Sequence, residues 1–112
     1  MGIQFIKCIF IVLVLVGCSA PFFIPTEQDI ALASVNGKDT TLDELTKGRT
    51  VYVNNCGKCH ALFKPTGFSE EKWKKIVPVM ALKAKITEAE GDQVLKYMLV
   101  IREAELNRST NK

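Results

Sequence analysis

The sequence of 112 residues contains a single histidine, His60, and only four cysteines. A structural zinc site needs four ligands, and Cys56, Cys59 and His60 provide three. Basic and acidic residues nearly balance, at 15 against 12, so the composition gives no sign of a nucleic-acid-binding surface. The chain also lacks internal repeats and low-complexity segments. These absences argue against a zinc-stabilised domain, a nucleic-acid-binding protein and a repeat protein.

No apolar run is long enough to cross a bilayer as a mature helix. The longest, residues 9–16, follows Lys7 and has the length of a signal-peptide hydrophobic region. The last two residues of the run and the two that follow it, Leu-Val-Gly17-Cys18, resemble the bacterial lipoprotein signal. The resemblance implies that Cys18 receives a diacylglyceryl thioether and becomes the first residue after cleavage. The alternative is an ordinary signal peptide cleaved one or two residues later, which would leave a soluble protein.

The chain therefore divides into three predicted parts: a lipoprotein signal peptide over 1–17, a membrane tether or linker over 18–38, and a globular domain over 39–112. The expected location is the bacterial cell envelope, with the domain lipid-anchored and facing the periplasm. Ser19 is not an acidic retention residue, so both the inner and the outer membrane stay open.

The run Cys56-Gly57-Lys58-Cys59-His60 has the C-x-x-C-H spacing by which haem c is covalently attached. Two thiols three positions apart can each form a thioether with a porphyrin vinyl group, and His60 can then supply an axial nitrogen to the iron. A thioredoxin-like C-x-x-C would need a preceding strand in a βαβ unit, and none is predicted. Cys8 would be removed with the signal peptide, so no thiol remains for a disulfide.

Three helices are predicted around this motif, which makes the domain all-α. The first, over about 41–54, begins with a capping-box pattern of Thr41 and Glu44. The second begins after Ser69, and Pro78 is expected to end or kink it near Val77. The third begins at Thr87 and runs to about residue 107, after which the polar tail is expected to fray. A shorter helical stretch is predicted after Thr26, followed by a turn at Asn36-Gly37.

The order of a helix bearing Gly48, the C-x-x-C-H motif, a helix bearing Trp73, a methionine and a last helix bearing Tyr97 resembles class I-like monohaem cytochromes c. The resemblance covers about residues 42–106. It implies a cytochrome c-like fold of three to four helices around one covalent haem. It also implies that the first and last helices cross closely, with Gly48 beneath Tyr97.

The resemblance also implies a second axial ligand shortly before the last helix, which points to Met80. A thioether is a soft ligand that favours ferrous iron and raises the reduction potential. Met98 is the competing methionine, although its place inside the last helix suits packing. The alternative is that Met80 fills the core beside Trp73, as a methionine at helical spacing usually does. With His60 already used, however, the iron needs another strong ligand or stays open.

Two further residues gain expected roles from the resemblance. A backbone carbonyl of the loop after the motif, residues 61–68 with Pro65, is expected to accept a hydrogen bond from the other ring nitrogen of His60, which would fix the ring; which carbonyl does so is left open. Trp73 either stacks near the haem, or bonds a haem propionate through its indole N–H, or is simply a core residue.

The predicted function is single-haem electron transfer between exported redox partners, without enzymatic activity, because no residue is placed as a catalytic base. One alternative is a haem sensor or a peroxidase-like protein with an open sixth site. Another is a cytochrome subunit of a larger respiratory complex. Lysines in the stretch around the haem either steer an acidic redox partner or form an ordinary solvated surface. They are Lys58, Lys64, Lys72, Lys74, Lys75, Lys83 and Lys85.

Overall fold

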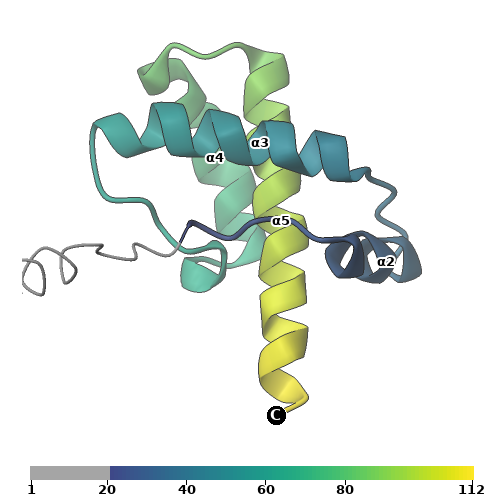
Figure 1. The fold of residues 1–112 in the computed structure, drawn as a ribbon. Coiled ribbons are helices and arrows are strands. Elements are labelled where there is room, and N and C mark those ends of the chain that lie inside the picture. The colour runs from purple at the N-terminus through teal and green to yellow at the C-terminus, as the bar shows by residue number, and fades with distance from the viewer. Residues whose placement is uncertain (1–20) are drawn as a thin grey trace, which may run out of the picture.

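The computed structural model describes residues 21–112, and over that range the protein is all-α with no strand (Figure 1). The signal peptide and the expected lipid-bearing Cys18 lie outside the described residues. In the described part, no helix combines the length and the apolar character needed to cross a membrane. The helices are α2 (Glu27–Val35), α3 (Leu42–Asn55), α4 (Glu70–Ala84) and α5 (Glu88–Thr110), with the 3₁₀ turns η1 (Cys56–Lys58) and η2 (Pro65–Gly67).

The predicted capping boxes begin α3 and α5. In α3 the Thr41 hydroxyl accepts from the Glu44 backbone N–H at 3.1 Å, and the Glu44 carboxylate accepts from the Thr41 N–H at 3.0 Å. Thr87 and Glu90 form the same pair in α5, at 3.1 and 2.7 Å. Each box satisfies N–H groups that a helix start leaves without intrahelical partners. Both helix starts predicted from the sequence are confirmed.

The crossing of α3 over α5 forms the centre of the fold (Figure 1). Leu45 and Tyr52 of α3 and Tyr97 of α5 are buried there. At Gly48 a Cβ atom would lie 2.2 Å from the Gln93 carbonyl oxygen and 2.8 Å from the Tyr97 Cβ. The two backbones can approach this closely because Gly48 has no side chain. The predicted contact of Gly48 with Tyr97 is confirmed.

Helix α4 does not end at Pro78, so the first of the two outcomes predicted for this proline is wrong, and a kink there stays a prediction. The helix continues to Ala84 and terminates where Lys85 adopts the left-handed conformation, with φ of 56°. Proline removes one intrahelical hydrogen bond, but the helix carries a buried face on both sides of it. Val77 and Ala81 both pack into the core, and this burial outweighs the local preference of proline.

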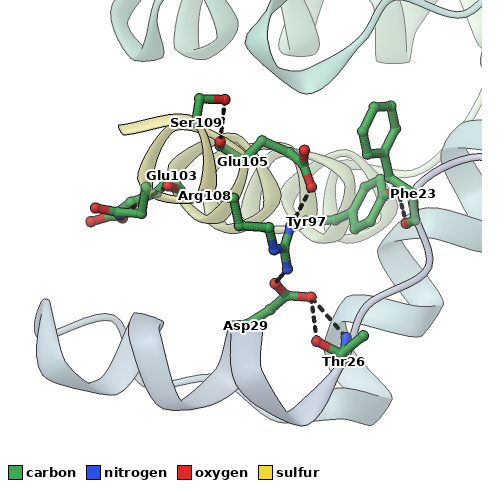
Figure 2. A network of polar contacts seen from close by, with 9 residues as sticks. Phe23, Thr26, Asp29, Tyr97, Glu103, Glu105, Arg108 and Ser109 are labelled. Carbon is green, nitrogen blue, oxygen red and sulfur yellow. Dashed lines mark hydrogen bonds and ion pairs between the residues drawn. The ribbon is translucent and has the colours of Figure 1, made fainter. Parts of the chain in front are cut away.

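Helix α5 extends three residues beyond the predicted end and reaches Thr110. The sequence predicted fraying from Arg108 onward, but Arg108 bridges the carboxylates of Glu105 and Asp29 (Figure 2). Asp29 is buried, and its other oxygen accepts from the Thr26 backbone N–H and hydroxyl at 2.8 and 3.0 Å. The ion pair thus holds α2 against the end of α5.

The residues between Pro21 and α2 lie across α3 and α5 instead of extending away from them (Figure 1). The Phe22 carbonyl accepts from Arg49 Nε at 2.6 Å, and the Phe23 carbonyl accepts from the Tyr97 hydroxyl at 2.7 Å. After the turn, where Gly37 has φ of +70°, Lys38 pairs with Glu103 at 2.9 Å. The linker predicted over 18–38 therefore contacts the domain from Phe22 onward. Its boundary at residue 38 stays a prediction.

Replacing Gly48 with Ala is expected to lower the free energy of unfolding by about 1–3 kcal/mol, because the added methyl group overpacks the crossing. Gly67→Ala is the matched control, since a Cβ at Gly67 meets nothing within 4 Å. Thermal or denaturant unfolding of both variants measures the difference. Equal stabilities would contradict the proposed role of the close approach.

Candidate functional site

The C-x-x-C-H motif begins directly after α3, as η1 and the residues that follow it. Cys56 is partly buried and Cys59 is exposed, and the two thiols are not joined in a disulfide. Burial raises the pKa of the Cys56 thiol, and the neighbouring Cys59 adds to the rise. Both cysteines therefore remain available for covalent attachment, in a position that the end of α3 fixes.

A cavity of about 240 Å³ joins this motif to α4 and α5. Its lining is mostly aliphatic and aromatic, and it contains no carboxylate. The volume lies just below the about 300–1,000 Å³ range of small-molecule clefts, so a porphyrin would have to widen it. The lining residues are Tyr52, Asn55, Cys56, Cys59, His60, Trp73, Ile76, Val77, Met80, Ala81, Lys83, Ala84, Ile86 and Val94.

The structure brings together all four predicted haem-contacting residues at this cavity: Cys56, Cys59 and His60 from the motif, and Met80 from α4. Met98 does not line it. Its side chain is fully buried in the core on α5, so the packing role considered for Met98 fits its position. Of the two methionines considered as the second iron ligand, only Met80, the one that the sequence favoured, lines the cavity.

The His60 ring is oriented by a backbone carbonyl of the loop after the motif, as expected. Nδ1 lies 2.8 Å from the Ala61 carbonyl oxygen. Because a carbonyl can only accept, Nδ1 carries the proton and the lone pair resides on Nε2, the atom available to a metal. The resemblance implied an acceptor in this loop without choosing the carbonyl, and the structure places it at Ala61.

The Pro65 carbonyl instead accepts a hydrogen bond from the Trp73 indole N–H at 2.8 Å. Trp73 is buried and also lines the cavity. Of the roles considered for Trp73, the structure shows the core residue with a satisfied N–H. This bond fixes the loop after the motif to the first turn of α4.

Tyr52 holds the other part of the same loop, and the sequence analysis missed this role. Its hydroxyl donates to the Phe63 carbonyl and accepts from the Phe63 backbone N–H, both at 2.9 Å. Burial raises the pKa of Tyr52 to about 12, so the hydroxyl keeps its proton. No sequence signal could have found this contact, because both partners of Tyr52 are backbone groups of another segment.

The seven lysines of residues 58–85, of which only Lys83 lines the cavity, fall into two groups. Lys74 and Lys75 pair with Glu70 and Glu71 one helical turn earlier, each at 2.7 Å, so their charge is compensated locally. The others form no ion pair within residues 21–112. They are Lys58, Lys64, Lys72, Lys83 and Lys85.

Among residues 21–112, no group of three or more His, Cys, Asp or Glu side chains converges to hold a metal ion. The three side chains of the motif line the cavity, but they do not converge on a common position where a metal ion could bind. They are Cys56, Cys59 and His60. Comparison with family models, with curated proteins and with solved structures finds no match to this chain.

Trp73→Phe is expected to lower the free energy of unfolding by about 1–3 kcal/mol, because it leaves the buried Pro65 carbonyl without its donor. Denaturant unfolding monitored by circular dichroism compares the variant with the parent. A Trp73→Phe variant as stable as the parent would show that the bond contributes nothing.

Proposed function

We propose that this chain is a membrane-anchored, single-haem electron-transfer protein of the cytochrome c type. The observation that carries the proposal is the cavity lined by Cys56, Cys59, His60 and Met80 together. These residues provide two thiols, one imidazole and one thioether, the set that haem c attachment and axial ligation require. The crossing of α3 and α5 at Gly48 and Tyr97 supports the resemblance to class I-like cytochromes c independently of the motif.

The residues present fit a covalently attached haem. Cys56 and Cys59 would hold the porphyrin edge, and His60 would bind the iron through Nε2, because Ala61 keeps the proton on Nδ1. Met80 would provide the other axial ligand from α4. When bound, the iron supplies a reversible one-electron centre.

The residues of the chain set the surroundings of that centre. The mostly aliphatic and aromatic lining offers few polar groups to hold water, which would limit the solvent reorganisation around a change of charge. No carboxylate faces the cavity, so the chain offers no carboxylate base there for enzyme chemistry. The thioether of Met80 favours the reduced state.

Two of the lysines that form no ion pair in the described part of the chain, Lys83 and Lys85, support a redox protein with an acidic surface as the partner. Lys83 lines the cavity and Lys85 follows it at the end of α4. Positive charge beside the candidate haem site would raise the rate of encounter with such a partner and would make that rate sensitive to salt.

Met80→Ala in the haem-loaded protein is expected to retain covalent haem but to lower the reduction potential, because the soft thioether is lost. The weak red absorption band of sulfur-ligated ferric haem should disappear, and the reduced protein should bind carbon monoxide. Met98→Ala is the control, and should keep the band and lose only stability. Survival of the band in Met80→Ala would reject Met80 as ligand, and carbon monoxide binding by the parent protein would favour the sensor or peroxidase-like alternative.

Cys18→Ala is expected to release the protein into the soluble periplasmic fraction or to block its processing, because lipid on Cys18 is the proposed membrane attachment. Cell fractionation with detection of covalent haem measures this directly. A Cys18→Ala protein that matures normally and still fractionates entirely with membranes would exclude the lipoprotein proposal. The haem proposal would be unaffected by that result.

A further inference from the structure

The distance between the proposed lipid and the folded domain is short. Cys18 and Phe22 are four residues apart, and an extended chain covers at most about 3.3–3.6 Å per residue. Any conformation of this stretch therefore keeps the lipid-bearing residue within about 14 Å of Phe22. Phe22 itself is fixed, because Arg49 Nε donates to its carbonyl at 2.6 Å. One particular face of the domain is consequently held at the membrane surface.

That face includes the loop after the C-x-x-C-H motif. The Phe22 ring lies 5.5 Å from the Tyr52 ring, measured between centroids. The Tyr52 hydroxyl in turn bonds both the N–H and the carbonyl of Phe63 at 2.9 Å. Tyr52 thus links the point where the chain leaves for the lipid to the loop that carries Phe63.

The surface of this loop combines an exposed aromatic ring with uncompensated positive charge. The side chain of Phe63 is 44% exposed. Lys58, Lys64 and Lys72 are exposed and form no ion pair within the described residues. Lys72 Nζ lies 4.5 Å from the centroid of the Phe68 ring, which packs 5.1 Å from the ring of Phe63. We call Lys58, Phe63, Lys64 and Lys72 the loop patch.

We propose that the loop patch is a second membrane contact, which binds anionic lipid headgroups once the chain is anchored; the proposal rests on the lipid attachment at Cys18 proposed above. An aromatic ring with flanking lysines suits the interface between headgroups and acyl chains. One lipid-bearing residue and one basic patch together also orient the domain, which a lipid on a flexible tether would not do. The short stretch from Cys18 to Phe22 favours a lipid surface over an acidic protein as the occupant of this patch.

The far end of α4 provides a matched control surface. Leu82 is 81% exposed and is followed by Lys83, so it also combines an apolar side chain with an uncompensated lysine. Lys83 lies eleven residues after Lys72 on the same helix, which corresponds to about 16 Å along the axis. This surface would remain free for a water-soluble redox partner.

The test uses the lipidated, haem-loaded protein in vesicles of neutral lipid or of neutral lipid mixed with phosphatidylglycerol. Amine acylation followed by mass spectrometry measures how fast each lysine side chain reacts. Lys58, Lys64 and Lys72 are expected to react about threefold or more slowly in the anionic vesicles, with protection lost at high salt. Lys83 and Lys85 should react equally in both. Equal labelling of the loop patch in both vesicles overturns the proposal and leaves an acidic protein as its ligand.

Two double variants test whether the protection of the lysines depends on the loop patch or on the charge and apolar surface of the protein in general. Phe63→Ser with Lys64→Glu should abolish the protection of Lys58 and Lys72, and folding should persist because Tyr52 bonds only backbone atoms of Phe63. Leu82→Ser with Lys85→Glu should leave it intact, because Lys85 is exposed and does not line the cavity. Protection that survives the first pair, or is lost in the second, contradicts the assignment of the contact to this patch.

A soluble form distinguishes failure of the patch from failure of the lipid proposal. The mass of the mature N-terminus shows whether Cys18 carries lipid. If it does not, the haem-loaded Cys18→Ala protein is sedimented with the same vesicles. Salt-sensitive binding to the anionic vesicles that the Phe63→Ser, Lys64→Glu pair removes would support the patch alone, and absence of such binding would reject it.

Discussion

The close approach of α3 to α5 at Gly48 is the constraint on which the other features of the fold depend. It places Tyr52, at the other end of the buried face of α3, beside the loop that follows the C-x-x-C-H motif. It also places Val94 of α5 at the wall of the cavity. If the two helices stood farther apart, the motif at the end of α3 and Met80 on α4 would no longer share one cavity.

The loop after the motif is held by two bonds that involve its backbone. Tyr52 bonds Phe63, and the Trp73 indole bonds the Pro65 carbonyl. Tyr52 and Trp73 are thus core residues whose polar groups also bind the backbone of the loop. They supply hydrogen bonds that the loop cannot form within itself. In the proposed function, this arrangement keeps His60 at a constant position, and a constant ligand geometry is what rapid one-electron transfer needs.

Local signals predicted more of this structure than long-range ones did. Capping boxes and apolar periodicity predicted where α3 and α5 begin, because those contacts lie within four residues along the chain. The continuation of α4 through Pro78 could not be predicted, since it depends on the burial of Val77 and Ala81 against another helix. The extension of α5 depends in the same way on Asp29, 79 residues earlier.

The candidate site likewise has features that the sequence predicts and features that only the structure shows. The spacing of Cys56, Cys59 and His60 could be read from the sequence because the chemistry itself requires it. The choice between Met80 and Met98 needed the cavity. The loop that holds the acceptor for His60 could be predicted, but the carbonyl itself could not, because backbone hydrogen bonds depend on loop conformation, to which side-chain identity is a poor guide.

The two hydrogen bonds that hold residues 22 and 23 also determine an order of folding. The Phe22 carbonyl needs Arg49 of α3, and the Phe23 carbonyl needs Tyr97 of α5. Both bonds of the segment therefore require that the two helices have already crossed. Within the described chain, the segment that is synthesised first obtains its donors from helices that are synthesised after it.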